Sequence, residues 1–463
     1  MLEGLTRFAL TQRLLVLLAV LLLAGGGWYA FRTTPVDAFP DVSVPQVKVI
    51  LKAPGMTPEE VERRITAPVE VEMLGIPRQE MLRSVAKYAL TDITLDFEEG
   101  TDIYWARQQV AERLAGIRDA LPDGVGGGIA PLTTPLGEMF MFTIEGGELS
   151  LMERRTLLDW VLRPALRTVP GVADVNALGG RVKTWEVSPD PARMASRDVT
   201  VAELVEALAR NNRDDGAGRL VEGEETLLVR STGAVRELAD LRGVVVVPDP
   251  VEPVRVADVA TVRLGSLTRY GAVTRDGEGE AVQGLVLGLR GANARSVVDG
   301  VRARLAELEG SLPEGVTVDV FYDRGELVSR AVGTVGNALA QAVVLVLLVL
   351  VVFLGNLRAA LTVAFVLPLA ALATFVLMRV FELSANLMSL GGLAIAIGLL
   401  VDSGVVVVEN VVAELGRARG ATIPRLHLVY RAVREVATPL ASGTAIIIIV
   451  FLPLLTLQGL EGK

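Results

Sequence analysis

The sequence predicts an α-helical membrane bundle joined to a large α+β region outside the membrane. Five predominantly apolar stretches approach the roughly 20 residues that a helix needs to cross a bilayer. The stretch between the first and second carries charges and turn residues throughout, with both strand-like and helical periods. The apolar stretches are about 14–31, 333–354, 359–381, 387–412 and 437–457.

The composition argues against several other classes of protein. Hydrophobic residues make up 51% of the 463 residues, too many for a disordered chain. The net charge of −9 disfavours nucleic acid as a partner, because nucleic-acid-binding proteins carry basic patches. There is no cysteine, and the single histidine, His427, falls in what we predict to be a basic loop. With no nucleophile elbow, P-loop or metal-ligand cluster in the outer region, we do not expect an enzyme.

Basic residues orient the spans. Arg7 and Arg13 precede the first span, and Arg358 lies in the short link between the second and the third. Segment 413–436, predicted to be a loop, is rich in arginine. Since positive residues stay on the cytoplasmic side, these segments are predicted inside and residues 32–330 outside.

The outer region begins with a predicted α+β unit. Strand 45–53 is followed by a helix that opens at Thr57 or Pro58, and then by one or two strands. Segment 101–121 has an apolar i, i+3, i+4 face and is predicted to be a second helix. Strand 138–144 would close this β-α-β-β-α-β unit of the ferredoxin-like kind.

A second unit of the same kind is interrupted by an insertion. Its first part is a helix followed by two strands joined by Gly179-Gly180, and its second part is a strand, a helix and a last strand. Residues 181–275 between them form an insertion rich in short strands, of which 225–232 and 243–248 are the clearest. The remaining elements are helix 151–168, strands 171–178 and 181–189, strand 281–289, helix 294–309 and strand 315–323.

Three long motifs resemble one family of transporters. "GTDIYWARQQVAERL" and "PGVADVNALGG" resemble the porter region of the heavy-metal-efflux branch of the resistance-nodulation-division (RND) pumps. "SANLMSLGGLAIAIGLLVDSGVVVVENV" resembles the fourth span of that branch. Essentially the whole chain is similar to the N-terminal half of such a pump.

The resemblance implies a division into subdomains. It also implies that the C-terminal half, with further spans and two more porter subdomains, is absent, and we interpret the chain as an N-terminal fragment. The implied parts are a tail and first span (1–31), a first porter subdomain (32–134), a second porter subdomain (135–180 and 276–330), a docking subdomain (181–275) and spans two to five (333–457).

The family further implies a proton-driven pump of the bacterial inner membrane that exports heavy-metal cations. It implies a homotrimer, surrounded by membrane lipid, that joins a periplasmic adaptor and an outer-membrane channel. No cofactor is expected, because the metal ion is the substrate and the proton is the coupling ion.

Two carboxylates in the fourth apolar stretch are the candidate proton relay. Asp402 and Glu409 are seven residues apart, so both face one side of a helix to within about 20°. A mid-span carboxylate costs about 3 kcal/mol, which is tolerable where it faces the bundle interior or water. We predict Asp402 as the proton carrier and Glu409 as an exit step or structural cap. The alternative is that both pair with basic groups to hold helices together. The resemblance places the basic partner of Asp402 in the absent half.

The identity of the metal is left open between Cu/Ag and Zn/Co/Cd. Exporters of divalent ions often carry a further aspartate where this chain has Ala396. Met388 matches a methionine of the copper/silver type, whose thioethers suit soft monovalent ions, but Leu400 does not match a second. Met139 and Met141 share one strand face and either line a metal path or fill the core.

Two further functions remain as alternatives. An RND exporter of organic compounds tends to carry two adjacent aspartates in span four, whereas Val401 and Ser403 flank Asp402 here. A non-transporting remnant would only bind an adaptor or a partner half.

Overall fold

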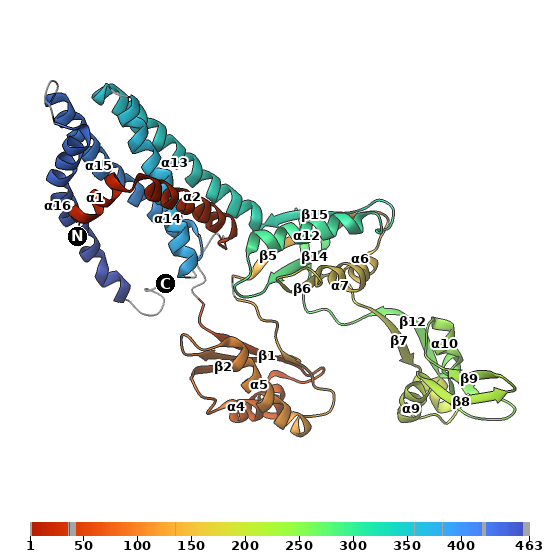
Figure 1. Cartoon of the computed structure of the whole chain (residues 1–463). Helices are drawn as coiled ribbons and strands as arrows, with labels where there is room; N and C mark the ends of the chain where they lie inside the picture. Colours follow the sequence, from red (N-terminus) through yellow and green to blue (C-terminus); the bar gives the residue numbers. More distant parts are fainter. Residues whose placement is uncertain are drawn as a thin grey trace.

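The computed structural model describes residues 2–35, 37, 43–134, 136–355, 357–381, 383–418 and 423–456. A bundle of long helices occupies one end of the molecule, and three α+β bodies extend from the other (Figure 1). Five of the described helices are long and apolar enough to cross a membrane. The predicted fold class, a membrane helical bundle with a large α+β region, is confirmed.

The bundle helices follow the predicted apolar stretches but extend beyond several of them. Helix α2 contacts α14, and α14 and α15 pack against each other and against α13. The helices are α1 (Leu2–Thr11), α2 (Arg13–Thr33), α13 (Arg324–Leu354), α14 (Leu357–Val380), α15 (Leu387–Arg417) and α16 (Arg425–Phe451), which ends in a 3-10 turn (Leu452–Thr456).

The prediction that 413–436 is a loop is wrong for most of its length. Helix α15 continues to Arg417 and α16 already begins at Arg425, so His427 lies in a helix. Leu428 and Ala432 are buried on one face of this part of α16. Hydropathy detects only the apolar part of such a helix, whereas arginine is a good helix former and extends it into water.

The first α+β unit is a four-stranded antiparallel sheet in the order β2-β3-β1-β4, with helices on one face. Buried apolar side chains of the strands, such as Val49 and Leu95, pack on Val61, Ile65 and Val110 of the helices. The elements are β1 (Gln46–Lys52), α3 (Pro58–Val61), π turn η1 (Glu62–Thr66), α4 (Ala67–Met73), β2 (Gln79–Lys87), β3 (Leu90–Phe97), α5 (Ile103–Ile117), 3-10 turn η2 (Arg118–Ala120) and β4 (Gly126–Ile129).

The fourth strand of this sheet is not the predicted one. Strand β4, which pairs with β1, closes the unit, and strand 138–144 is part of the second sheet instead. The sequence of β4 is Gly-Gly-Gly-Ile, which has no alternation of apolar residues to mark it as a strand. Its place is set by hydrogen bonding to its neighbour rather than by side-chain pattern.

The second unit repeats the topology of the first. Its sheet has the order β13-β14-β5-β15, and β6 also pairs with β14. Strands joined in sequence by Gly179-Gly180 do not pair with each other, because β6 stays in this sheet and β7 leaves it. The elements are β5 (Glu138–Gly146), α6 (Leu151–Leu157), π turn η3 (Leu158–Leu162), α7 (Arg163–Leu166), β6 (Val172–Gly179), β13 (Val273–Arg275), β14 (Gly279–Gly288), α12 (Ala294–Glu309) and β15 (Val316–Asp323).

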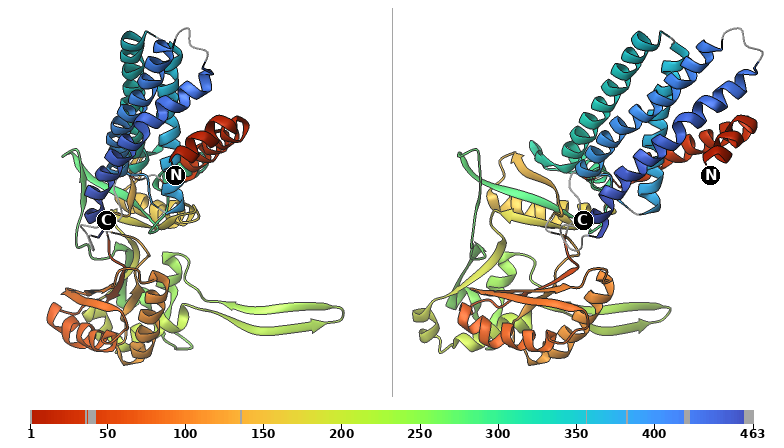
Figure 2. Two further views of the ribbon diagram at one scale, coloured as in Figure 1. Left: turned by 60° about the vertical axis from the view of Figure 1, so that its left-hand side comes forward. Right: turned by 90° about the vertical axis from the view of Figure 1, so that its left-hand side faces the viewer.

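The inserted segment forms a body of its own, joined to the second unit beside the β7–β12 ladder (Figure 1). A small core that includes Met194, Leu204 and Val256 holds it together. From it the β8–β9 hairpin projects as a long ribbon (Figure 2, left). The elements are β7 (Lys183–Pro189), α8 (Pro191–Ser196), α9 (Val201–Asn211), β8 (Asp214–Glu222), β9 (Glu225–Thr232), α10 (Leu238–Gly243), β10 (Val245–Val247), β11 (Val254–Arg255), α11 (Val256–Val259) and β12 (Ala260–Ser266).

Close packing in the second sheet depends on a glycine in its central pair of strands. Gly284 of β14 lies opposite Phe142 of β5, whose ring is fully buried against the helices. A Cβ at Gly284 would come within 2.3 Å of that ring. A Cβ at Gly279, on the same strand, would meet nothing within 4 Å.

We therefore expect Gly284→Ala to destabilise the second unit by about 1–3 kcal/mol, because the core must shift to admit the methyl group. Hydrogen exchange of the β5 and β14 amides should accelerate in this variant. Gly279→Ala is the matched control and should leave exchange unchanged. Equal protection in both variants would contradict the packing described here.

Candidate functional site

Helix α15 carries the candidate relay and is anchored at both ends. At its start the Asn386 side chain accepts hydrogen bonds from the backbone N–H groups of Met388 and Ser389, at 3.0 and 2.9 Å. Along its length Leu390 and Ile397 are buried against neighbouring helices. One face of α15 is therefore fixed against the bundle, and the opposite flank is free of these contacts.

The predicted residues Met388, Asp402 and Glu409 share that free flank. They occur at a spacing of seven residues, with Ile395 in the remaining position. Met388 and Ile395 are each 72% exposed, and both carboxylates are exposed as well. At 1.5 Å per residue, Asp402 lies about 10 Å from Glu409 and about 21 Å from Met388 along the axis. The structure thus brings the three onto one stripe, which we call the α15 stripe.

Neither carboxylate of the stripe has a hydrogen-bond or ion-pair partner among the residues that the structure describes. The contacts between α15 and α16 are made by other side chains. Asn410 donates to the Ala432 carbonyl at 2.8 Å, and Glu414 lies 3.7 Å from Arg431. No described residue therefore pairs with Glu409 to hold two helices together. The role of Glu409 in the proton relay stays a prediction.

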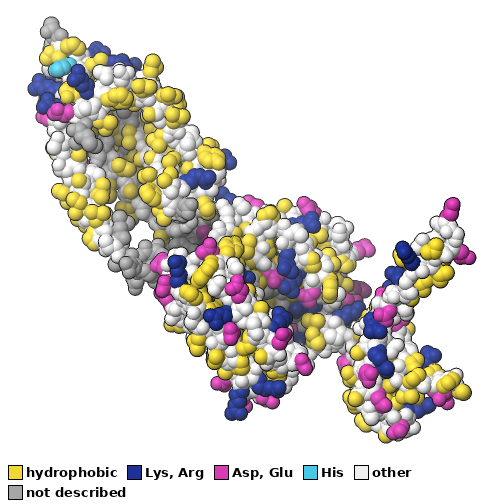
Figure 3. Space-filling view, turned by 60° about the horizontal axis from the view of Figure 1, so that its bottom comes forward, with side chains coloured by type: hydrophobic (Ala, Val, Ile, Leu, Met, Phe, Trp, Pro, Cys, Tyr) yellow, Lys and Arg dark blue, Asp and Glu magenta, His cyan; other side chains and the backbone are white. Residues whose placement is uncertain are grey.

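Basic residues gather at the end of the bundle farthest from the α+β region. Figure 3 shows Lys and Arg side chains around the histidine at that tip, while hydrophobic side chains cover the bundle below. Arg434 of α16 also pairs with Glu3 of α1 at 2.6 Å. This asymmetry matches the positive-inside pattern expected from the sequence.

Met139 and Met141 lie on β5 of the second sheet and not on the α15 stripe. Met139 is buried, and its thioether covers Gly288, where a Cβ would come within 2.2 Å of the Met139 Cε. Met139 also borders a cavity of about 100 Å³ that is lined by Arg290 and Arg324. Two guanidinium groups outnumber the one carboxylate at this cavity, Asp37, and their positive charge disfavours a metal cation there. These contacts favour the packing role for Met139, and the ligand role of both methionines stays a prediction.

No group of three or more His, Asp or Glu side chains able to hold a metal ion occurs among the described residues.

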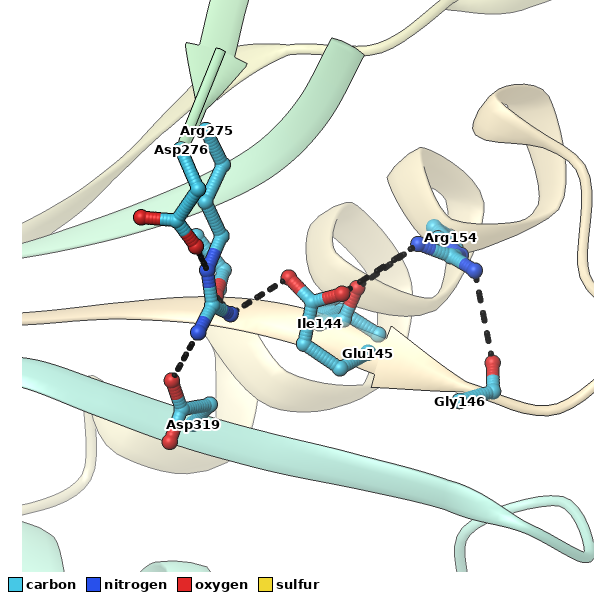
Figure 4. A network of polar contacts seen from close by, with 8 residues as sticks. Ile144, Glu145, Gly146, Arg154, Arg275, Asp276 and Asp319 are labelled. Carbon is cyan, nitrogen blue, oxygen red and sulfur yellow. Dashed lines mark hydrogen bonds and ion pairs between the residues drawn. The ribbon is translucent and has the colours of Figure 1, made fainter. Parts of the chain in front are cut away.

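A polar hub that the sequence did not reveal lies in the second unit (Figure 4). Arg275 of β13 is 2.9 Å from Glu145 of β5 and 2.6 Å from Asp319 of β15, and it donates to Thr143 at 2.8 Å. The hydrogen bonds that it donates to Glu145 and Asp276 raise the pKa of Arg275 above its ordinary value. The Arg275 guanidinium thus links strands β13, β5 and β15. Of these, β5 and β15 are neighbours in the sheet although they are far apart in the sequence.

The only sequence signal for this hub is the alternation of β5. Thr143 and Glu145 alternate with Phe142 and Ile144, which are buried against the helices. The polar pair must therefore face the opposite side of the sheet. Which basic residue meets it there depends on strand order, which the pattern does not give.

The model of the AcrB/AcrD/AcrF family matches residues 5–463. The chain belongs to this family.

Individual relatives and a solved structure agree with that assignment. The cobalt-zinc-cadmium resistance protein CzcA of Cupriavidus metallidurans is 41% identical over 478 residues, covering 100% of this chain and 45% of the relative. The cation efflux system protein CusA of Escherichia coli K12 is 35% identical over 473 residues, with 100% and 45% coverage. A crystal structure of a heavy metal efflux pump matches with a TM-score of 0.88 at 35% identity, covering 99% of this chain and 45% of that one.

These matches confirm the resemblance to the N-terminal half of heavy-metal-efflux RND proteins. The chain spans about half the length of the curated relatives it matches. The relatives named here are efflux and resistance proteins and not enzymes, as expected for this chain.

The polar hub leads to a prediction for the second unit. Arg275→Gln removes the charge shared by Glu145 and Asp319, and because the site is partly exposed we expect a loss of about 1–2 kcal/mol. Hydrogen exchange at β13 and β15 should accelerate. Arg269→Gln, which breaks a pair with Glu280 alone, is the control and should have the smaller effect. If both variants behave alike, Arg275 is not a hub.

Proposed function

We propose that this chain is the N-terminal part of a proton-driven pump that exports heavy-metal cations across the bacterial inner membrane. The observation that carries the proposal is Asp402, a carboxylate in the middle of an apolar helix with no ion-pair partner among the described residues, in a family that includes metal-resistance proteins. Such a group is costly in a bilayer and needs a functional reason to be there.

Asp402 would act by alternating between protonated and ionised forms. In its neutral form it tolerates an apolar surrounding, and in its ionised form it needs water or a cation nearby. The α15 stripe is the flank that the described helices leave uncovered, which supports contact with a further part of the pump. That part would supply the basic partner, and Glu409, one heptad nearer the arginine-rich end, would pass the proton on.

The orientation follows from charge. The arginine-rich ends of α15 and α16 would lie in the cytoplasm, and residues 32–330 in the periplasm. The first unit and the second unit would then be the two porter subdomains. The inserted body would be the docking subdomain facing an outer-membrane channel, with a periplasmic adaptor completing the assembly.

The β8–β9 hairpin supports assembly with further copies of this chain. Every residue of both strands is exposed, and Leu228 is 84% exposed. A two-stranded ribbon is only marginally stable alone in water, so packing against a partner surface would stabilise it. We propose that neighbouring copies provide that surface in a homotrimer.

Two kinds of metal ion are supported by different observations. The 41% identical relative is named for cobalt, zinc and cadmium, which favours divalent ions. Ala396 and the exposed thioether of Met388 on the α15 stripe favour a soft monovalent ion such as Cu(I) or Ag(I). An exporter of organic compounds and a non-transporting remnant are the alternatives that transport measurements would separate.

Replacing Asp402 tests the proton relay. Asp402→Asn keeps the size of the side chain but cannot ionise, so we expect it to abolish metal resistance in cells that express the complete pump. Expression and assembly should be unchanged, as measured by immunoblot and native gel. Ser403→Ala on the same helix is the control and should retain resistance. Resistance at the wild-type level in Asp402→Asn would refute the relay.

Replacing Met388 tests the choice of metal. Met388→Leu roughly conserves volume and should cost less than about 1.5 kcal/mol in stability. We expect a selective loss of copper or silver resistance, with zinc and cobalt resistance unchanged. Met378→Leu, at a buried position of α14, controls for packing. Unaltered copper and silver resistance, together with demonstrable zinc or cobalt export, would favour the divalent ions instead.

A further inference from the structure

An ion pair between a buried arginine and a partly buried aspartate lies where the helical bundle meets the second unit. The Nε and Nη2 atoms of Arg324 lie 2.8 and 2.7 Å from the Oδ1 atom of Asp37. A third nitrogen of the same guanidinium donates to the backbone carbonyl of Leu136. The Arg324 side chain is only 5% exposed, so it depends on these partners for its stability.

Arg324 occupies a position that connects the bundle to the α+β region. It is the first residue of α13, directly after β15. The preceding residue, Asp323, accepts a hydrogen bond from the backbone N–H of Glu326 and pairs with Arg302 of α12. The start of this span is thereby fixed to the second unit on one side and to Asp37 on the other.

Asp37 in turn holds the start of α15. Its backbone N–H donates to the Ala385 carbonyl at 3.0 Å, and the Ala385 N–H donates to the Pro35 carbonyl at 2.9 Å. Ala385 is fully buried and directly precedes Asn386, the N-cap of α15. Pro35 and Asp37, which follow the first span, are therefore hydrogen-bonded to the residue that leads into the helix carrying Asp402.

Leu136 extends the connection to the sheet. It lies two residues before β5, which pairs with both β14 and β15. The cavity of about 100 Å³ at this junction is lined by Asp37, Leu136, Arg324 and Ser384. Polar contacts around this cavity thus add to the apolar packing of Ala385 against Ala30 and Phe375.

We propose that Asp37 and Arg324 are positioning residues that keep the outer end of α15, and through it Asp402, in register with the second α+β unit. The proposal rests on the proposed function, because it takes Asp402 as the proton carrier. A change at Asp402 that tilts or shifts α15 moves Ala385 and Asp37, and Arg324 passes that displacement to the start of β5. A guanidinium suits this role because it stays charged and bonds several oxygens in fixed directions.

Cross-linking reports directly on how the segment before α15 is positioned relative to the segment before β5. The chain has no cysteine, so Leu136→Cys and Ser384→Cys introduce a single pair of thiols across the cavity. In the membrane-embedded chain we expect a short bifunctional thiol reagent to join them efficiently. Adding Arg324→Gln should lower the cross-linked fraction at least threefold, and Asp37→Asn should do the same.

The controls separate positioning from a general loss of stability. Arg330→Gln removes an exposed arginine of the same helix, paired with Glu326, and should leave cross-linking unchanged. Combining Asp37→Asn with Arg324→Gln should be no worse than Arg324→Gln alone, because the contact between the two side chains is already lost in the single variant. Unchanged cross-linking in Arg324→Gln, or effects that multiply in the double variant, would overturn the proposal.

Transport provides an independent readout. In the complete pump, Arg324→Gln should narrow the pH range over which metal is exported, and Arg324→Lys should restore part of it. A pH profile identical to wild type in Arg324→Gln would also overturn the proposal. Transport by the Asp402→Asn variant would refute the proton relay. The cross-linking experiment does not depend on transport, so its outcome tests the positioning role separately from the relay.

Discussion

The cost of placing charge in the hydrocarbon layer determines how this chain is arranged. Along the described spans, charged side chains gather near the ends, where a bilayer would give way to water. Asp402 is the charged residue nearest the middle of its span, and it shares with Glu409 the one flank of α15 that other described helices do not cover. The same constraint thus accounts for the apolar spans and for the interest of Asp402 as a candidate site.

Outside the bundle, the two ferredoxin-like units bury their apolar residues in the same way. Each sheet buries one face under helices, with Phe97 or Phe142 at the centre of its core. In the second unit, the other face carries the polar residues that meet Arg275. The division between an apolar and a polar face follows from the strand period, and it leaves one surface of the second unit available for polar contacts.

The two regions meet through polar contacts as well as through the chain. Arg324 contacts Asp37 and the Leu136 carbonyl, while Asp37 is hydrogen-bonded to Ala385. The directional hydrogen bonds of this junction add to the apolar packing of Ala385. Such contacts would suit the pump proposed above, in which protonation of Asp402 has to affect the region outside the membrane.

The sequence by itself determined what depends on local composition and period. The apolar spans, the shared side of Asp402 and Glu409, and the helices and alternating strands of both units can be read from residue spacing. It did not reveal β4, whose glycines have no pattern, or the helical start of α16, whose arginines obscure the helix in a hydropathy profile. Only the tertiary structure placed strand 138–144 in the second sheet and brought Arg275 to Glu145 and Arg324 to Asp37. These contacts join residues from 130 to 287 positions apart, and such pairings are set by strand order and by the path of the chain, which no local pattern encodes.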